Sequence, residues 1–127
     1  MSHNCKAVIV HCIDFRFQKA LNEFLQKNDL IGNIDRISIP GGVKDMKKVL
    51  EYVELSVKLH GTKEVYLVNH QDCGAYGLGE IEFTKEKEIH KKDLEKMKKI
   101  LSEKIPGLKI NILFLLKNEF APLNFSL

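Results

Sequence analysis

Apolar and polar residues follow two different periods along this chain, and each change of period marks the start of an expected element. Short, nearly continuous apolar runs are typical of buried strands, whereas apolar residues at every third or fourth position are typical of helices with one buried face. The apolar runs predict strands at residues 6–12, 35–40, 64–69 and 108–116. The helical spacing predicts helices over residues 17–25, 46–60 and 84–105.

The residues at the ends of the second predicted helix match the preferences of helix caps. Asp45 can accept hydrogen bonds from the first free backbone N–H groups, and Gly61 can end the helix in a left-handed conformation. Lys58 and His60 place basic groups in the last turn, where they complement the negative end of the helix dipole. The third predicted helix is ended by the Pro-Gly pair at residues 106–107.

Strands that alternate with helices favour right-handed crossovers and a mostly parallel sheet. We therefore expect an α/β fold, with a Rossmann-like sheet of about four strands flanked by helices, and we expect residues 1–127 to form one domain. In such sheets ligands bind beyond the C-terminal ends of the strands. The first strand ends at Cys12 and the third at His70, so both ends share one crevice if these strands are neighbours.

Composition and charge exclude several classes of protein. A chain that is 44% hydrophobic and 29% charged is typical of a globular protein. The net charge of +3 arises between residues 85 and 104, where eight lysines face five acidic residues at helical spacing, which favours a solvated helix face over a nucleic-acid surface. No apolar run is long enough to cross a membrane, and the N-terminus lacks a signal-peptide pattern. We expect a cytoplasmic protein with no nucleic-acid or membrane partner.

Two groups of reactive side chains fall where the first and third predicted strands end. The segment HCIDFRF carries Cys12, Asp14 and Arg16, and the segment VNHQDCGAYG carries His70 and Cys73. Two thiolates and one imidazole suit zinc, and three protein ligands leave the open position that a catalytic zinc keeps for water. Taken singly, the same residues could be a strand-end histidine, a small buried cysteine and a surface ion pair.

Other roles for the cysteines fit the sequence less well. A phosphatase-type phosphate loop needs an arginine six positions after Cys12, where Gln18 stands, and a rhodanese-type loop needs it at five, where Phe17 stands. Three cysteines are an odd number, which excludes a complete disulfide framework. Cys5 stands near the start of the chain without a second cysteine or ligand at a recognisable spacing, and we assign it no role.

The pair of motifs resembles the β-class carbonic anhydrases. Cys12-Ile-Asp14-Phe-Arg16 is followed about sixty residues later by His70-Gln-Asp-Cys73-Gly, and this spacing is specific. The runs PGGVKD and GTKEVYLVNHQDCG are similar to the corresponding runs of that family. The resemblance implies the fold of that family. It also implies an enzyme, a zinc lyase that reversibly hydrates carbon dioxide to hydrogencarbonate by a zinc-bound hydroxide.

The resemblance also implies a role for each site residue. Cys12, His70 and Cys73 would hold Zn²⁺. Asp14 would accept a hydrogen bond from the zinc-bound water or, in a closed form, take the fourth coordination site itself. Arg16 would pair with Asp14 and hold it off the metal, so we expect Asp14 and Arg16 to be the catalytic residues.

The family also builds its sites at a dimer interface, so we expect a homodimer or an assembly of dimers. The apolar tail FAPLNFSL would be buried against the partner subunit, although it could pack on its own sheet instead.

The sequence departs from the family pattern in ways that leave two alternatives open. Ser38 and Ile39 stand where the family usually carries an arginine and an asparagine, and Leu30 stands about where a glutamine contacts substrate. The segment before Cys12 is short and the chain end lacks the usual closing hairpin, which implies a minimal member of the family. The alternatives are a non-catalytic zinc protein on the same fold and a hydrolase of COS or CS₂.

Overall fold

The structure is a computed structural model that describes residues 3–117 and 123–125. Its elements are β1 (Ala7–His11), η1 (Phe15–Phe17), α1 (Gln18–Lys27), β2 (Ile34–Ser38), α2 (Met46–His60), β3 (Glu64–His70), α3 (Phe83–Lys104), β4 (Lys109–Leu115) and β5 (Leu123–Asn124). Each strand and helix predicted from the spacing of apolar residues is present, and only the end residues differ.

The strands form a single sheet in the order β2-β1-β3-β4-β5. The first four strands of this order are parallel, and β5 runs antiparallel to β4. The predicted fold class, a mostly parallel sheet flanked by helices, is confirmed. The expectation that the chain end lacks a closing strand pair is wrong, because Leu113 pairs with Asn124 and Phe114 pairs with Leu123. A strand of two residues is too short to show a period in the sequence.

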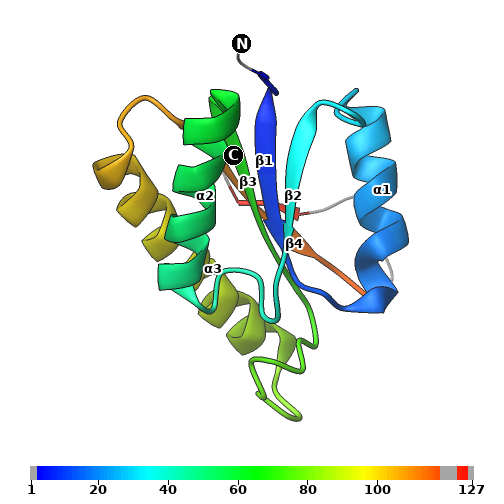
Figure 1. The fold of residues 1–127 in the computed structure, drawn as a ribbon. Coiled ribbons are helices and arrows are strands. Elements are labelled where there is room, and N and C mark those ends of the chain that lie inside the picture. Colours follow the sequence, from blue (N-terminus) through cyan, green and yellow to red (C-terminus); the bar gives the residue numbers. More distant parts are fainter. Residues whose placement is uncertain (1–2, 118–122, 126–127) are drawn as a thin grey trace.

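Helices cover both faces of the sheet (Figure 1), with α1 on one face and α2 and α3 on the other. The residues of β1 alternate between two cores, because Val8 and Val10 pack with α2 and α3 while Ala7 and Ile9 pack with α1. All five residues of β1 are therefore buried, which explains why this strand appears in the sequence as a continuous apolar run.

The predicted ends of α2 are confirmed. The side chain of Asp45 accepts a hydrogen bond from the backbone N–H of Lys48 at 3.2 Å, and Gly61 follows the helix in the left-handed conformation with φ of 61°. In α3 the apolar side of the lysine-rich helix, which includes Leu94 and Met97, is buried as expected. No helix among residues 3–117 is both long enough and apolar enough to cross a bilayer.

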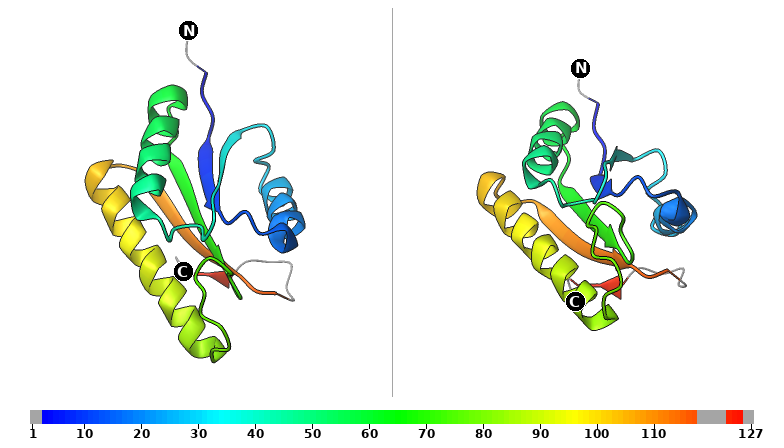
Figure 2. Two further views of the ribbon diagram at one scale, coloured as in Figure 1. Left: turned by 60° about the horizontal axis from the view of Figure 1, so that its bottom comes forward. Right: turned by 90° about the horizontal axis from the view of Figure 1, so that it is seen from below.

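Neighbouring strand ends form one edge of the sheet, and this edge carries the candidate site. Strands β1 and β3 are paired in parallel, so their C-terminal ends lie side by side at the lower edge in Figure 1, which faces the viewer in the right panel of Figure 2.

The loop after β2 packs closely onto β3 at Gly42. A Cβ atom there would lie 2.5 Å from Oδ1 of Asn69 and 2.6 Å from the carbonyl oxygen of Val68, and φ is +61°. Only glycine fits this approach without displacement of the loop.

Candidate metal centre

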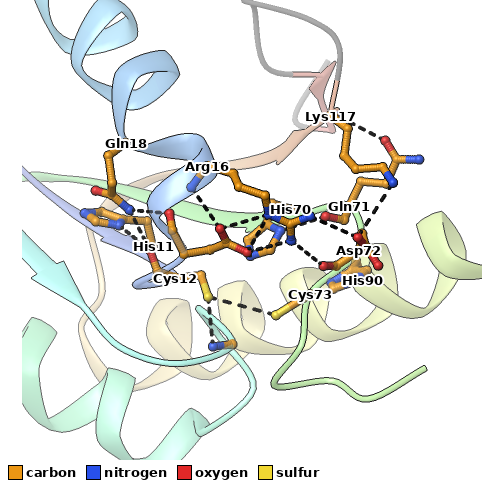
Figure 3. A network of polar contacts seen from close by, with 12 residues as sticks. His11, Cys12, Arg16, Gln18, His70, Gln71, Asp72, Cys73, His90 and Lys117 are labelled. Atoms are coloured by element: carbon orange, nitrogen blue, oxygen red, sulfur yellow. Dashed lines mark hydrogen bonds and ion pairs between the residues drawn. The ribbon is translucent and has the colours of Figure 1, made fainter. Parts of the chain in front are cut away.

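Cys12, His70 and Cys73 converge at the C-terminal edge of the sheet (Figure 3). All three side chains are buried, and their ligand atoms lie within 4.8 Å of one another. The two Sγ atoms are 4.0 Å apart. Cys12 follows β1 directly and His70 is the last residue of β3, so the pairing of β1 with β3 brings together the two motifs that the sequence placed at strand ends.

The imidazole of His70 is held with one nitrogen free. Its Nδ1 lies 2.8 Å from the carbonyl oxygen of Gln71, which can only accept a hydrogen bond, so Nδ1 carries the proton and Nε2 carries a lone pair. The ring stacks on Phe17 with centroids 4.3 Å apart. Nε2 is buried and has no hydrogen-bond partner among the residues that the structure describes. A buried lone pair with no donor beside two sulfur atoms is the arrangement expected of a metal ligand.

Hydrogen bonds to the sulfur of Cys12 favour its thiolate. The hydrogen bond with the Cys73 thiol is the largest of several that lower the pKa of the Cys12 thiol, and the backbone N–H of Gly41 also points at Sγ at 3.3 Å. The same pairing raises the pKa of the Cys73 thiol. Burial disfavours the cation of His70, but the nearby sulfur of Cys12 and the carbonyl of Gln71 raise its pKa overall. Of the two thiols, that of Cys12 is therefore the more easily ionised.

Asp14 and Arg16 form the pair that the sequence predicted. Nη2 of Arg16 lies 2.7 Å from Oδ2 of Asp14, and Nε lies 3.1 Å from Oδ1. The backbone N–H of Arg16 also donates to Oδ1 at 2.9 Å. These contacts, led by the side-chain hydrogen bond with Arg16, lower the pKa of Asp14 to about 2. Oδ2 of Asp14 lies 3.8 Å from Nε2 of His70, so the carboxylate borders the three ligand atoms.

One partner of Arg16 was missed by the sequence reasoning. Nη1 of Arg16 donates to Oδ2 of Asp72 at 3.0 Å, and Nη2 donates to the backbone carbonyl of Asp72 at 2.9 Å. Asp72 directly precedes Cys73 and adopts φ of 59°, in the left-handed region. Its position between the candidate ligands His70 and Cys73 could have indicated that Asp72 belongs to the site.

A second group of missed residues connects α3 to β3 and to the loop that follows β3. Oδ1 of Asn69 accepts a hydrogen bond from the N–H of Val43 at 3.0 Å, and Nδ2 of Asn69 lies 2.9 Å from Nδ1 of His90 and 2.9 Å from the hydroxyl of Tyr76. Glu86, one turn before His90, accepts a hydrogen bond from the backbone N–H of Asp72. These contacts fix the two loops that carry Gly41 and Cys73 to one helix.

The spacing of the buried residues of α3 could have indicated Glu86 and His90, the two members of this group that lie on the helix. The buried residues of α3 are Glu86, His90, Leu94, Met97 and Leu101. Leu94, Met97 and Leu101 form the apolar part of this face. The two polar residues continue the same face toward the N-terminus of the helix at intervals of four residues.

The three residues that depart from the family pattern lie in different environments. Leu30 is completely buried in the core between α1 and the sheet. It precedes β2 in the chain and so lies toward the strand end opposite the site. Ser38 ends β2 opposite His11, and the N–H of Ile39 donates to the carbonyl of His11 at 3.0 Å. Ser38 and Ile39 therefore border Cys12, whereas Leu30 does not.

Cys5 belongs to a second group of possible ligand atoms that the sequence did not reveal. Its Sγ, a carboxylate oxygen of Asp35 and a nitrogen of His60 lie within 4.8 Å of one another, before the N-terminal ends of β1 and β2. Nδ1 of His60 is already 2.7 Å from Oδ2 of Asp35, and the hydroxyl of Ser56 donates to the same oxygen at 2.6 Å. In this group the imidazole and the carboxylate are therefore already paired with each other.

The chain is similar to a known protein family and to proteins of Rickettsia. A family model described as "Putative carbonic anhydrase" matches residues 2–122. An uncharacterized protein of Rickettsia conorii is 30% identical over 122 residues, and the match covers 85% of this chain and 66% of that protein. The chain therefore spans about two thirds of the length of this relative.

Solved structures share the fold at low sequence identity. The carbonic anhydrase of Streptococcus mutans has a TM-score of 0.70 at 20% identity, covering 97% of this chain and 82% of that chain. A carbon disulfide hydrolase in its apo form has a TM-score of 0.61 at 16% identity, covering 92% of this chain and 76% of that chain. The likeness of fold agrees with the family match, and the resemblance expected from the motifs is confirmed. Because the family model matches residues 2–122, the chain belongs to this carbonic anhydrase family.

Proposed function

We propose that this protein is a zinc-dependent enzyme that reversibly hydrates carbon dioxide to hydrogencarbonate. The observation that carries the proposal is the convergence of two thiols and one free imidazole nitrogen beside a carboxylate that an arginine holds in place. Membership of the carbonic anhydrase family supports the same reaction.

The donor atoms of the site fit zinc. Zinc–sulfur bonds of about 2.3 Å place two sulfurs of a tetrahedral site slightly less than 4 Å apart. The Sγ atoms of Cys12 and Cys73 are 4.0 Å apart, and Nε2 of His70 lies with them without a hydrogen bond to any residue that the structure describes. Zinc bound by these three residues would lower the pKa of a coordinated water toward about 7 and so supply hydroxide near neutral pH.

Asp14 would act as a hydrogen-bond acceptor beside the reacting oxygen. Its pKa of about 2 keeps the carboxylate ionised throughout the physiological range, so it can accept a hydrogen bond but cannot donate one. An acceptor fixed on one side of the hydroxide orients the remaining proton and leaves a lone pair directed at the carbon of CO₂. The backbone hydrogen bond from Arg16 holds this carboxylate in one orientation.

Arg16 would keep Asp14 out of the open coordination position. The planar guanidinium contacts both carboxylate oxygens of Asp14, which a lysine could not do in the same geometry. A carboxylate freed from this contact is a hard anionic ligand for zinc and could take the place of water. The pair is therefore proposed as the catalytic dyad and as the gate of the site.

A substrate panel separates this proposal from its two alternatives. Zinc-loaded protein would be given CO₂ in a pH-indicator stopped-flow assay, and COS or CS₂ in an assay of sulfide release. We expect acceleration of CO₂ hydration that rises with pH. Full zinc occupancy with no acceleration for any substrate would favour the non-catalytic zinc protein. Sulfide release without CO₂ hydration would favour the hydrolase, for which the shared fold of a carbon disulfide hydrolase is the supporting observation.

We also propose a homodimer or an assembly of dimers, with a second copy covering the loop beside the site. Phe15 is 84% exposed and Ile13 is 56% exposed, and both flank Asp14. The tail gives less support, because Phe125 packs on the chain's own Phe114, and residues 118–122 and 126–127 lie outside the described residues. Light scattering at micromolar concentration should give at least twice the chain mass for the wild type and a lower mass for Phe15→Glu. A monomeric wild type would exclude the proposal.

A reducing compartment such as the cytoplasm is proposed as the place of action. The thiols of Cys12 and Cys73 are free and their sulfurs are 4.0 Å apart, close enough that an oxidising compartment would favour a bond between them. Such a bond would remove both sulfur donors. Fractionation of cells that express the tagged protein should place it with cytoplasmic markers, and recovery in an oxidising compartment would contradict this proposal.

A further inference from the structure

We propose that Asp72 is a positioning residue that holds Arg16 beside Asp14, so that the catalytic pair is in fact a unit of three residues. The consequence for metal access rests on the proposed function, whereas the hold of Asp72 on Arg16 can be tested without metal.

The guanidinium of Arg16 lies between two acidic residues. One edge, Nε and Nη2, faces Asp14 at 2.7 to 3.2 Å. The other edge, Nη1 and Nη2, faces Asp72, whose Oδ2 and backbone carbonyl accept hydrogen bonds at 3.0 Å and 2.9 Å. All three nitrogens of the planar group are therefore engaged, which fixes its orientation in a way that a single carboxylate would not.

Asp72 is itself held on two sides. Its backbone N–H donates to the buried carboxylate of Glu86 on α3. Its Oδ2 lies 3.6 Å from Nζ of Lys117, just beyond β4. Ion pairs of alternating charge therefore link the loop after β1 to the ends of β3 and β4, in the order Asp14, Arg16, Asp72 and Lys117.

The backbone of Asp72 supports a role for the side chain. A φ of 59° is sterically unfavourable for a residue with a Cβ, and glycine adopts it at no such cost. The turn itself therefore does not need the side chain of Asp72, although aspartate tolerates this conformation better than most residues. The use that the structure shows is the contact with Arg16.

Loss of this contact would weaken the restraint on Asp14. The side chain of Arg16 is 38% exposed, so a guanidinium held by one carboxylate can leave for solvent. Oδ2 of Asp14 lies 3.8 Å from Nε2 of His70, so a released Asp14 needs only a small movement to reach the three ligand atoms. Asp72 would thus set how often the open position of the site is blocked.

The first experiment uses metal-free protein and the variant Asp72→Asn. Asparagine keeps the size of the side chain and tolerates positive φ, so the substitution removes the charge with little backbone effect. Hydrogen exchange at Nε of Arg16, followed by NMR, should be about tenfold faster in the variant, because this N–H donates to Asp14 only while the guanidinium stays in place. The matched control is Asp29→Asn, the other described non-glycine residue with positive φ (56°), which lies in the turn after α1. Exchange in Asp72→Asn equal to that in the control would overturn the proposal.

The second experiment reports on the open position with cobalt in place of zinc. Azide binding, followed by the visible absorption of the cobalt protein, should be about tenfold weaker in Asp72→Asn than in the wild type. In Asp14→Ala the same Asp72→Asn change should have no effect, because the blocking carboxylate is absent. Unchanged azide affinity in the single variant would refute the effect on metal access. If the wild type binds no cobalt, the proposed function fails, and the exchange experiment alone decides the role of Asp72.

Discussion

Oδ2 of Asp14 lies 3.8 Å from Nε2 of His70, so the carboxylate lies directly beside one of the three candidate ligand atoms. Among the described residues, the hydrogen bonds to its side-chain oxygens all come from Arg16. Under the proposed function, this carboxylate would either assist the reaction or block the open position, depending on its contact with Arg16.

This relationship predicts non-additive effects in a double-mutant cycle. Asp14→Ala should lower the rate of CO₂ hydration sharply, because the acceptor is lost. Arg16→Ala should also lower it, because Asp14 is free to enter the open position. The double variant should be no slower than Arg16→Ala alone, since the blocking ligand is gone. Rates that multiply, measured by stopped flow on protein of equal zinc content, would show two independent contributors instead of a gate.

Metal analysis should give about one zinc per chain in protein purified without chelators. Cys73→Ser should empty the site, because a hydroxyl replaces one of two sulfur donors. Cys5→Ser is the matched control and should keep the zinc, since the group of Cys5, Asp35 and His60 is already joined by a hydrogen bond of 2.7 Å. Full zinc content in Cys73→Ser, or loss of zinc in Cys5→Ser, would contradict the assignment of ligands.

Gly42→Ala should destabilise the protein by about 2 kcal/mol or more. The added Cβ would lie 2.5 Å from Oδ1 of Asn69, and the backbone has a φ of +61°. Gly79→Ala is the control, because Gly79 has nearly the same φ, +63°, and no atom within 4 Å of the added Cβ. Urea denaturation of both variants separates the steric contact from the backbone preference. Equal free energies of unfolding would show that the close approach to β3 does not matter.

The stability of the metal-free protein should fall between pH 6.5 and about pH 4 because of His90. Burial, followed by the charge of His70, lowers the pKa of His90 from 6.5 to about 4. Below pH 6.5 the unfolded chain binds a proton at this residue that the folded protein does not bind, so the stability present above pH 6.5 is lost as the pH falls. The slope from this residue is at most about 1.4 kcal/mol per pH unit.

His90→Gln removes this titration while keeping an amide that can accept the hydrogen bond from Asn69. The free energy of unfolding of the variant should therefore depend less on pH in this range than that of the wild type. Parallel curves for the two proteins, measured by urea denaturation at several pH values, would show that His90 titrates normally.

The fold and the convergence of the three candidate ligands could be predicted because both depend on patterns that survive in the sequence. The parallel strands are buried on both faces, so they appear as apolar runs whose ends are sharply marked. Cys12 and His70 stand at two of these ends, and the C-terminal edge of a parallel sheet is where such residues meet. The prediction that these two ends lie together depended on β1 and β3 being neighbours, and the order of the strands shows that they are.

The rest could not be predicted from apolar residues alone. Glu86 and His90 continue the spacing of the buried face of α3, but their polar character resembles that of its solvated face. The contact between Asp72 and Arg16 joins residues far apart in sequence through a turn with positive φ. Leu30 was compared with a substrate-contacting position by its place in the sequence alone, and its burial in the α1 core could not be foreseen.

The most direct test of zinc-dependent CO₂ hydration at Cys12, His70 and Cys73 is a zinc titration of activity. Protein stripped with a chelator would be reloaded stepwise, and CO₂ hydration at pH 8 to 9 followed by stopped flow. We predict no rate above background without zinc, a rise in proportion to zinc up to about one per chain, and no rise in Cys73→Ser. A fully loaded wild type that stays at background, or a Cys73→Ser variant that hydrates CO₂ at the wild-type rate, would contradict the proposed function.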